Sequence, residues 1–276
     1  MSVIYEASFP NLSICHSLDL HPQKNDFPMH VHNHNEIFVF VSGHASYLVE
    51  GSEYPLSMGS LLTIRESESH AINFLSDEPY ERFVINFSPS VISDIDPERK
   101  LLTPFYDREL GVGNLYETGD LPNTSALSYL KAMCSQSSDP YEKRIALVSH
   151  LLPLLHDISR AFKSKSSVTD EQALLSVRII SYVNDHLFEP ITTPDVAKHF
   201  YMSVSQLERI FKRATHSSVW HYVTVKRLAA ARAKIESGYS STAACAECGF
   251  GDYSAFYRAY VKEYGAPPNA HRRAFD

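Results

Sequence analysis

The feature that most constrains this chain is a two-helix pattern that occurs twice between residues 191 and 272. In each copy a short helix with apolar residues is followed by a tight connection, a capping residue and a second helix that has one apolar and one polar face. A helical pattern free of internal Pro and Gly, from Ser217 to about Gly238, separates the copies and predicts a stiff connecting helix. Pairs of short helices joined in this way are typical of a helix-turn-helix.

The first copy opens at Thr193-Pro194 and, after a connection at Tyr201-Met202, continues with a helix capped by Ser203. Ala197 falls where the two helices cross, and a small side chain there permits close approach. The second helix turns a polar, partly basic face outward, which suits the major groove of DNA. The outward residues are Ser205, Gln206, Glu208, Arg209 and Lys212.

The second copy begins near Ser241, turns at residues 249–252 and resumes as a helix from Tyr253 to about Tyr264. Asp252 can cap that helix, and the glycines of the turn adopt conformations that other residues resist. The outward residues of this helix are Tyr253, Ser254, Tyr257, Arg258 and Lys262.

Charge is distributed so that the C-terminal part suits DNA, although the whole chain carries a formal charge of −7. From Ile191 to the end there are 12 Lys and Arg against 7 Asp and Glu, a net charge of +5, so the remaining residues carry −12. The basic excess lies where phosphates would be met. We expect Arg209 and Arg258 to contact bases, and Lys212 and Lys262 to contact phosphates. The alternative for each is a solvated surface charge.

Over about 80 residues this region resembles the DNA-binding domain of the AraC/XylS family of transcription regulators. The residues that match, at the family's spacing, are Ser203, Leu207, Arg209, Phe211-Lys212, Arg227-Leu228, Ala231, Gly249-Phe250, Phe256, Arg258, Gly265, Pro268 and Arg272. Three residues depart from the pattern, namely His216, Pro267 and His271, and none of them replaces a residue expected to face DNA. His216 stands where glycine is usual and can still adopt a left-handed conformation.

The resemblance implies a transcription regulator, most simply an activator controlled by a small molecule. Two recognition helices on one connecting helix of about 20 residues, and so about 30 Å long, could enter successive major grooves about 34 Å apart. A purely architectural DNA binder without an effector is one alternative. Cys245 and Cys248 form a C-x-x-C, but they fall on the apolar side of a helix and no second Cys/His pair has zinc-site spacing, which favours packing.

Residues from about Ser2 to Ser90 predict a β domain. Many short strands separated by turn residues are typical of a barrel or a sandwich. The runs are Ser13–Leu20, Glu36–Val41, Ala45–Val49, Ser60–Ile64, His70–Phe74 and Arg82–Phe87.

A group of histidines stands out in this β region. His30, His32 and Glu36 share one side of an extended segment because side chains alternate along a strand, and His70 opens a later strand. With Gly43 this spacing is similar to the first motif of the cupin barrel. The second cupin motif is only partly present, because Arg65 and Ser67 stand where Pro and Gly are usual.

Two interpretations of this group remain open. One is a divalent transition metal, which an N/O donor set suits, held by His30, His32, Glu36 and His70; no other cofactor is indicated. The other, implied by the family resemblance, is a small-molecule effector, a sugar being one frequent class, with contacts from His30, His32, Glu36, Phe38, Arg65 and His70. The metal interpretation carries an alternative function, a metal-dependent cupin enzyme (oxygenase or isomerase) fused to a DNA-binding module.

Helical patterns return after a mixed stretch at residues 92–122. Asn123 or Thr124 can cap one helix, and Pro140 begins another that runs to about Phe162. The second helix carries a wide apolar stripe that either packs against the β domain or forms a dimer, as the family resemblance implies. The stripe comprises Ile145, Val148, Leu151, Leu152, Leu155, Ile158 and Phe162. A polar run at 163–167 predicts a linker, after which Asp170 caps a further helix.

The predicted fold is therefore multidomain α+β. We expect a cupin-like β-barrel at residues 1–95, a helical connecting and dimerisation segment at 96–162, a linker at 163–169 and an all-α DNA-binding domain with two helix-turn-helix motifs at 170–276. The N-terminus lacks a signal peptide and no segment could cross a membrane, so we expect a cytoplasmic protein that is not an enzyme. Expected partners are double-stranded promoter DNA, the effector, a second copy in a homodimer and, for an activator, RNA polymerase.

Overall fold

The computed structural model describes residues 2–23, 27–121, 126–165 and 175–271. By its contacts the chain divides into two compact units. Unit 1 comprises Met1–Pro28, His34–Glu66 and Ile72–Glu171, and unit 2 comprises Met29–Asn33, Ser67–Ala71 and Gln172–Asp276. Two short segments of the N-terminal half therefore belong to the unit that contains the predicted DNA-binding helices.

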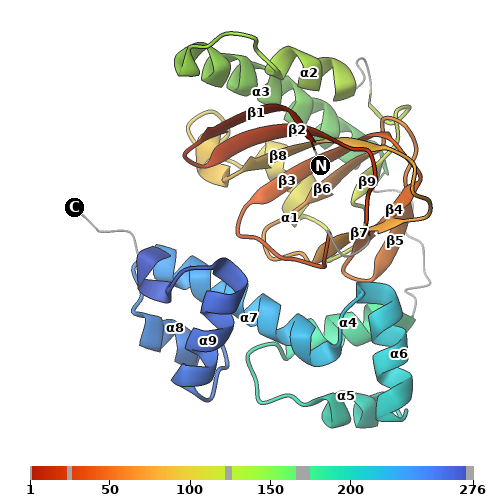
Figure 1. Ribbon diagram of the computed structural model, residues 1–276, viewed down its shortest axis with the longest axis vertical. Coiled ribbons are helices and arrows are strands. Elements are labelled where there is room, and N and C mark those ends of the chain that lie inside the picture. The colour runs from red at the N-terminus through yellow and green to blue at the C-terminus, as the bar shows by residue number, and fades with distance from the viewer. Residues whose placement is uncertain (1, 24–26, 122–125, 166–174, 272–276) are drawn as a thin grey trace. The chain divides into compact units, whose positions relative to one another are not determined.

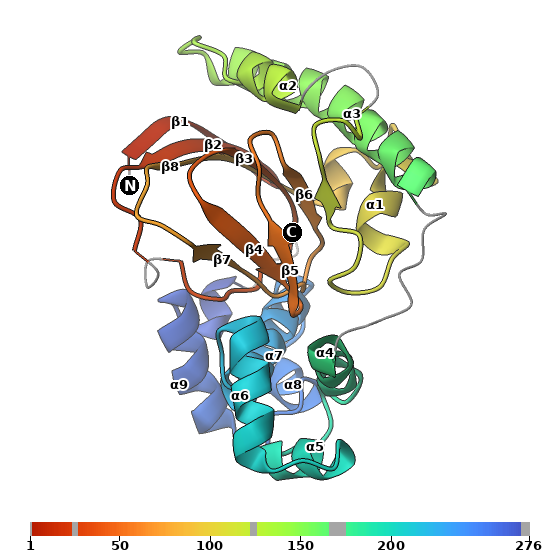
Figure 2. The same ribbon diagram turned by 90° about the vertical axis from the view of Figure 1, so that its right-hand side faces the viewer.

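Unit 1 is built on two antiparallel sheets rather than one closed barrel sheet (Figures 1 and 2). The six-stranded sheet has the order β1 (Ser2–Phe9), β2 (Leu12–Asp19), β8 (Tyr80–Phe87), β3 (Asn35–Ser42), β6 (Leu61–Ile64) and β9 (Leu115–Tyr116). The three-stranded sheet has the order β5 (Ser52–Pro55), β4 (Ala45–Val49) and β7 (His70–Phe74), and the first two residues of β7 belong to unit 2. All six predicted runs are strands, whereas β1, β5 and β9 had no separate prediction.

Strand alternation gives the six-stranded sheet two different apolar faces. Ile37 and Val39 of β3 and Ile85 of β8 face one way, and they form one core with the helices α2 (Ala126–Met133) and α3 (Pro140–Lys165). Phe38 and Phe40 face the other way, into a second core with Tyr47 of β4. Figure 1 shows α2 and α3 along the first of these faces. Each fully buried Ile or Phe contributes about 1.5–3 kcal/mol.

The apolar stripe of α3 packs in the first core. Leu151, Leu155 and Ile158 are fully buried, and so are Leu147 and Leu154, which widen the stripe beyond the predicted set. Ile145 at the start of the stripe stays half exposed. The helix continues to Lys165, three residues into the predicted linker. The rest of the linker and the caps predicted at Asn123 or Thr124 and at Asp170 lie outside the described residues.

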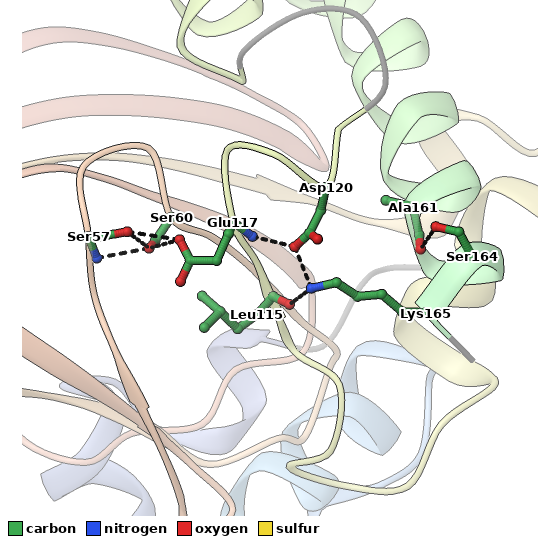
Figure 3. A network of polar contacts seen from close by, with 8 residues as sticks. All are labelled: Ser57, Ser60, Leu115, Glu117, Asp120, Ala161, Ser164 and Lys165. Atoms are coloured by element: carbon green, nitrogen blue, oxygen red, sulfur yellow. Dashed lines mark hydrogen bonds and ion pairs between the residues drawn. The ribbon is translucent and has the colours of Figure 1, made fainter. Parts of the chain in front are cut away.

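The C-terminal end of α3 is tied to the sheets of unit 1 by a polar network (Figure 3). Lys165 forms an ion pair with Asp120 and donates from Nζ to the carbonyl of Leu115, 3.2 Å away. Asp120 accepts from the backbone of Glu117, whose carboxylate in turn accepts from Ser57 in the turn between β5 and β6. The point where the chain leaves α3 is therefore fixed to the edge of the six-stranded sheet.

Unit 2 is helical apart from its two N-terminal segments. Its helices are α4 (Leu175–Asp185), α5 (Thr193–His199), α6 (Val204–Thr215), α7 (Val219–Glu236), α8 (Ser241–Glu247) and α9 (Tyr253–Tyr264). Both predicted helix pairs and the connecting helix are confirmed. Along the described residues, no helix is both long and apolar enough to cross a bilayer.

The two helix pairs repeat each other in detail. Tyr201 and Gly249 occupy the same position of the turn, and both have positive φ, at 55° and 76°. The following amide in each turn donates back to the first helix, from Met202 to the carbonyl of Ala197 and from Phe250 to that of Cys245. These matching bonds confirm that the sequence pattern is one structural motif written twice.

The caps of the two recognition helices repeat as well. Ser203 accepts from the amide of Gln206, and Asp252 accepts from the amide of Ala255, as predicted. At the C-terminal ends, His216 and Gly265 are both left-handed, with φ of 56° and 67°. His216 thus adopts the conformation that the sequence required of it in place of glycine.

Cys245 and Cys248 are both buried against α7. Burial raises the pKa of the Cys248 thiol to about 11 and also raises that of Cys245. A thiol of that pKa is almost entirely protonated near neutral pH, which does not suit nucleophilic or redox chemistry. The pair packs the second helix-turn-helix, as the sequence predicted.

Candidate DNA-binding and effector sites

The outer face of α6 is exposed at four of its five predicted residues. Ser205, Gln206, Arg209 and Lys212 are exposed, while Leu207 and Phe211 on the inner face are completely buried. The amphipathic pattern therefore fixes the rotation of the helix, and it leaves one hydrogen-bonding and cationic surface outside.

Glu208 lies differently from the rest of the predicted set. It is half-buried, and its carboxylate accepts from the amide of Val219, 3.4 Å away, at the N-terminal end of α7. A carboxylate in that position offsets the positive end of the helix dipole. Glu208 therefore fixes α6 to α7, a role that the outward-face pattern did not reveal.

The outer face of α9 is the counterpart of that of α6. Ser254, Arg258 and Lys262 are exposed, and Tyr257 is 42% exposed. Arg258 makes no ion pair with any residue that the structure describes. Tyr253 is held by a hydrogen bond between its hydroxyl and that of Ser241, 2.9 Å away. Arg209 and Arg258 thus occupy equivalent places on two equivalent helices.

Arg227 of α7 joins the connection between α4 and α5 to the turn of the second helix pair. Its Nε donates to the carbonyl of Leu187 at 2.6 Å, Nη2 to that of Glu189 at 2.7 Å and Nη1 to that of Gly249 at 2.7 Å. The side chain is 5% exposed, and burial lowers the pKa of the guanidinium. A planar guanidinium carries donors on three separate nitrogens and can reach three carbonyls at once, whereas a lysine has all its donors on one nitrogen.

Gly249 is required at this junction for two reasons. Its φ of +76° disfavours a side chain, and a Cβ there would lie 2.7 Å from the carbonyl oxygen of Phe188. Arg227 and Gly249 together set the angle between α7 and the second helix pair. In the sequence, Arg227 and Gly249 could be singled out only because they match the family pattern, since neither belongs to an outward face.

In unit 1 the face of the six-stranded sheet opposite α3 contains polar groups among aromatic rings. Glu36, a predicted site residue, is 5% exposed, and its carboxylate accepts from the hydroxyl of Tyr47 at 3.3 Å. Phe38, also predicted, packs on Tyr47 with ring centroids 4.5 Å apart. Burial holds the pKa of Tyr47 well above its usual value and Glu36 raises it further, so the hydroxyl stays protonated as a donor.

Two polar residues on the same face were missed by the sequence analysis. Asn86 pairs directly across from Glu36 in the sheet, and Arg82 pairs across from Phe40. The Arg82 guanidinium lies 4.9 Å from the ring centroids of both Phe27 and Tyr80. The Oδ1 atom of Asn86 is buried and has no hydrogen-bond partner among the described residues. Polar residues at alternate positions of an apolar strand were the available signal, but only the register showed what they face.

The predicted histidines form a group of their own. His30, His32 and His70 have ligand nitrogens that all lie within 4.8 Å of one another, and the group does not include Glu36. The prediction that residues 30–36 form one strand is wrong, because β3 begins only at Asn35. His30 and His70 instead meet through an isolated antiparallel bridge. Arg65, the remaining predicted contact, is half-buried directly after β6.

Two copies of a helix-turn-helix with exposed basic faces, in a chain that also contains a domain built on β-sheets, define a DNA-binding protein with a second domain. A family model described as the AraC-like ligand binding domain matches residues 17–156, just over half the chain. A second model, described as a helix-turn-helix domain, matches residues 196–274. The chain belongs to the AraC/XylS family of transcription regulators, which accounts for both halves.

Relatives are similar over nearly the whole chain. The HTH-type transcriptional activator RhaS of Salmonella arizonae is 24% identical, with 96% of this chain and 99% of the relative covered. The activator RhaR of Mannheimia succiniciproducens is 22% identical, with 90% and 88% covered. Among solved structures, apo ToxT K231A from Vibrio cholerae is 14% identical with a TM-score of 0.45 and covers 96% of this chain and 98% of its own.

Replacing Arg227 by Met should lower the free energy of unfolding of unit 2 by about 3–5 kcal/mol, because a buried guanidinium and its bonds to three backbone carbonyls are lost. The matched control is Arg232→Met on the same helix, whose partly exposed ion pair with Glu236 should contribute about 1 kcal/mol or less. Urea unfolding of the full chain, followed by circular dichroism at the helical band, measures both. Equal losses for the two variants would contradict the role assigned to Arg227.

Proposed function

We propose that this protein is an effector-responsive transcription activator that inserts α6 and α9 into successive major grooves of promoter DNA. The supporting observation is the repeated motif, with matching turns and caps and with both outer faces exposed, at the two ends of α7 (Figure 1). α7 has 18 residues and is therefore about 27 Å long, close to the 34 Å that separates successive grooves. Such a protein acts in the cytoplasm, where an activator would also contact RNA polymerase.

The contacts with DNA divide by chemistry. Arg209 and Arg258 have planar, bidentate guanidinium groups that match the O6 and N7 atoms of guanine. Lys212 and Lys262 lie one turn further along each helix and are point charges suited to phosphates. Ser205, Gln206, Ser254 and Tyr257 supply additional hydrogen bonds, whereas Glu208 acts indirectly by holding α6 against α7.

Replacing Arg209 by Ala should weaken binding to the specific site by about 1–3 kcal/mol and relax sequence preference at one position. Lys212→Ala should instead weaken binding to specific and random DNA alike and reduce the salt dependence. Fluorescence anisotropy with DNA from upstream of the protein's own gene, against a scrambled duplex, measures both. Arg144→Ala, an exposed arginine of α3, is the matched control. Base contact by Arg209 is refuted if its variant loses affinity equally for both duplexes.

We further infer that the effector is a neutral polyhydroxylated molecule of the sugar type, bound on the face of the six-stranded sheet that lies opposite α3. Sugars combine an apolar ring face with closely spaced hydroxyl groups. Aromatic rings at Phe38 and Tyr47 suit the first, and a carboxylate, an amide oxygen and a guanidinium at Glu36, Asn86 and Arg82 suit the second. The Oδ1 of Asn86, for which the described part of the chain supplies no hydrogen-bond partner, is an acceptor that such a ligand would satisfy.

A panel of monosaccharides should therefore include one that raises the melting temperature of the full chain. Arg82→Met should lower affinity for that sugar about tenfold or more, because it removes a charged hydrogen-bond donor from the site. Arg99→Met is the matched control, since Arg99 also lies over an aromatic ring, that of Tyr106, but elsewhere in unit 1. Calorimetric titration gives the affinities. A sugar that binds Arg82→Met as tightly as wild type would rule out this site.

The functional form is inferred to be a homodimer, in keeping with the family. Tyr141 and Ile145 lie four residues apart on one face of α3, and they are 70% and 50% exposed. This patch continues the buried stripe of the helix onto the surface, so a second copy of α3 could extend the same core. The buried residues of the stripe already pack in the core of unit 1.

Ile145→Glu should shift the protein from dimer toward monomer, because it places an unpaired carboxylate in an apolar contact. Sedimentation velocity over a range of concentrations measures the dissociation constant, which should rise at least tenfold. Met58→Glu, at a side chain that is 72% exposed and outside α3, is the control. An unchanged dissociation constant for Ile145→Glu, or a loss of dimer in both variants, would remove α3 from the interface.

A further inference from the structure

Three imidazoles from two distant parts of the sequence meet in unit 2. The backbone of His30 pairs with that of His70 through two hydrogen bonds of 3.1 Å, and the amide of Ser67 donates to the carbonyl of His32 at 2.9 Å. The ring centroids of His30 and His32 lie 4.2 and 4.7 Å from that of His70. Backbone pairing of the segments 29–33 and 67–71 therefore holds the three rings together.

The orientation of His70 is set by its surroundings. Its side chain is 1% exposed, and its Nδ1 lies 2.9 Å from the carbonyl oxygen of Glu68. A carbonyl only accepts, so in the neutral ring the proton is on Nδ1 and the lone pair is on Nε2. Histidines that bind metals are commonly held by such a bond from the other ring nitrogen to a carbonyl. His70 is thus arranged as a ligand.

The chemistry of the donors selects the class of ion. Imidazole nitrogen suits zinc, nickel, copper and iron, whereas magnesium and calcium prefer oxygen. Three histidines are a sufficient protein ligand set for zinc and leave a position for water or another ligand. The carboxylate of Glu36 is not among the grouped donors.

The two segments that carry the histidines are bound to α7. Ser67 accepts from Nζ of Lys226 at 2.5 Å, and that lysine is only 5% exposed. The Nδ2 atom of Asn33 donates to the carboxylate of Glu236, ten residues further along the helix. Met29, Val31 and Ala71 are buried in the same apolar core as α4, α6 and α7. A ligand that joins these two segments therefore also holds Ser67 and Asn33, the residues that α7 contacts.

We infer that His30, His32 and His70 form a binding site for a divalent transition metal ion, and that the ion stabilises unit 2 and strengthens DNA binding. The ion joins segment 29–33 to segment 67–71 and so holds Ser67 and Asn33 in place against Lys226 and Glu236. An ion that binds only this arrangement stabilises it by RT ln(1 + [M]/Kd), where [M] is the free ion concentration. The contacts on α7 leave the outer faces of α6 and α9 exposed. The ion therefore raises DNA affinity by ordering unit 2 before DNA binds. Only the effect on DNA binding rests on the proposed function.

Cobalt(II) tests the site directly, because it replaces zinc and has visible absorption bands that depend on its ligands. The full chain without a polyhistidine tag, stripped with a chelator, should bind one cobalt ion that zinc displaces. His32→Ala and His30→Ala should each lower affinity at least tenfold. His34→Ala, next to the group but outside it, should bind as wild type does. A wild-type chain with no bound cobalt, or equal loss in all three variants, overturns the inference.

Hydrogen exchange tests the coupling to α7. Zinc at about 100 times its Kd should slow exchange of α7 amides by up to about 100-fold, with little change in β1 and β2. Lys226→Met should keep the cobalt spectrum, which also reports correct folding, but lose most of the protection of α7. Zinc protection confined to unit 1, or unaffected by Lys226→Met, would overturn the coupling.

DNA affinity completes the test and separates the two proposals. Zinc should raise the affinity of wild type for upstream DNA about fivefold or more, and that of Lys226→Met by clearly less. Failure of all variants to bind DNA would refute the proposed function while leaving the cobalt result intact. DNA binding that depends on Arg209 but is unchanged or weakened by zinc would refute the regulatory step of the inference alone.

Discussion

The arrangement of the helices in unit 2 depends on the buried side chain of Arg227. Arg227 donates to carbonyls of Leu187, Glu189 and Gly249, which belong to two connections that are far apart in the sequence. Each helix pair alone is too small to bury a substantial core, so its orientation must come from what it shares with α7. Because the guanidinium is planar and always charged, it fixes both connections relative to one helix. The connection that precedes the first helix pair is thereby held to the turn of the second.

In the six-stranded sheet of unit 1, side chains alternate between two faces, and each face packs in a different core. Odd-numbered residues of β3, such as Ile37 and Val39, pack against α3, and even-numbered residues, such as Phe38 and Phe40, pack toward the smaller sheet. One strand therefore supports the helical layer and the candidate effector site at once. A ligand that shifts Glu36 or Phe38 would act on the same strand against which the helices pack. The bonds of Lys165 to Leu115 and Asp120 also join the end of α3 to that sheet.

Local patterns predicted the helices of unit 2 well, since caps, helical periodicity and turn residues are short-range signals. Ser203 and Asp252 cap where expected, and His216 adopts the left-handed conformation in place of glycine. The strands were also found, but their register was not, because pairing between β3 and β8 joins residues some fifty positions apart. Arg82 and Asn86 were missed for that reason. The role of Glu208 was hidden similarly, because its partner amide at Val219 belongs to the next helix.

The sequence predicted that His30, His32 and His70 lie together, but the strand geometry from which it predicted this is wrong. Alternation along a strand would have placed Glu36 beside His30 and His32, but residues 31–34 are not a strand, and the grouping comes from pairing between His30 and His70. The consequence is functional, because Glu36 belongs to unit 1 while the three imidazoles belong to unit 2. A ligand in unit 1 can change DNA binding only if its affinity differs between two arrangements of the protein. The ion proposed in unit 2 would obey the same rule, but the two arrangements would differ only within the DNA-binding unit itself.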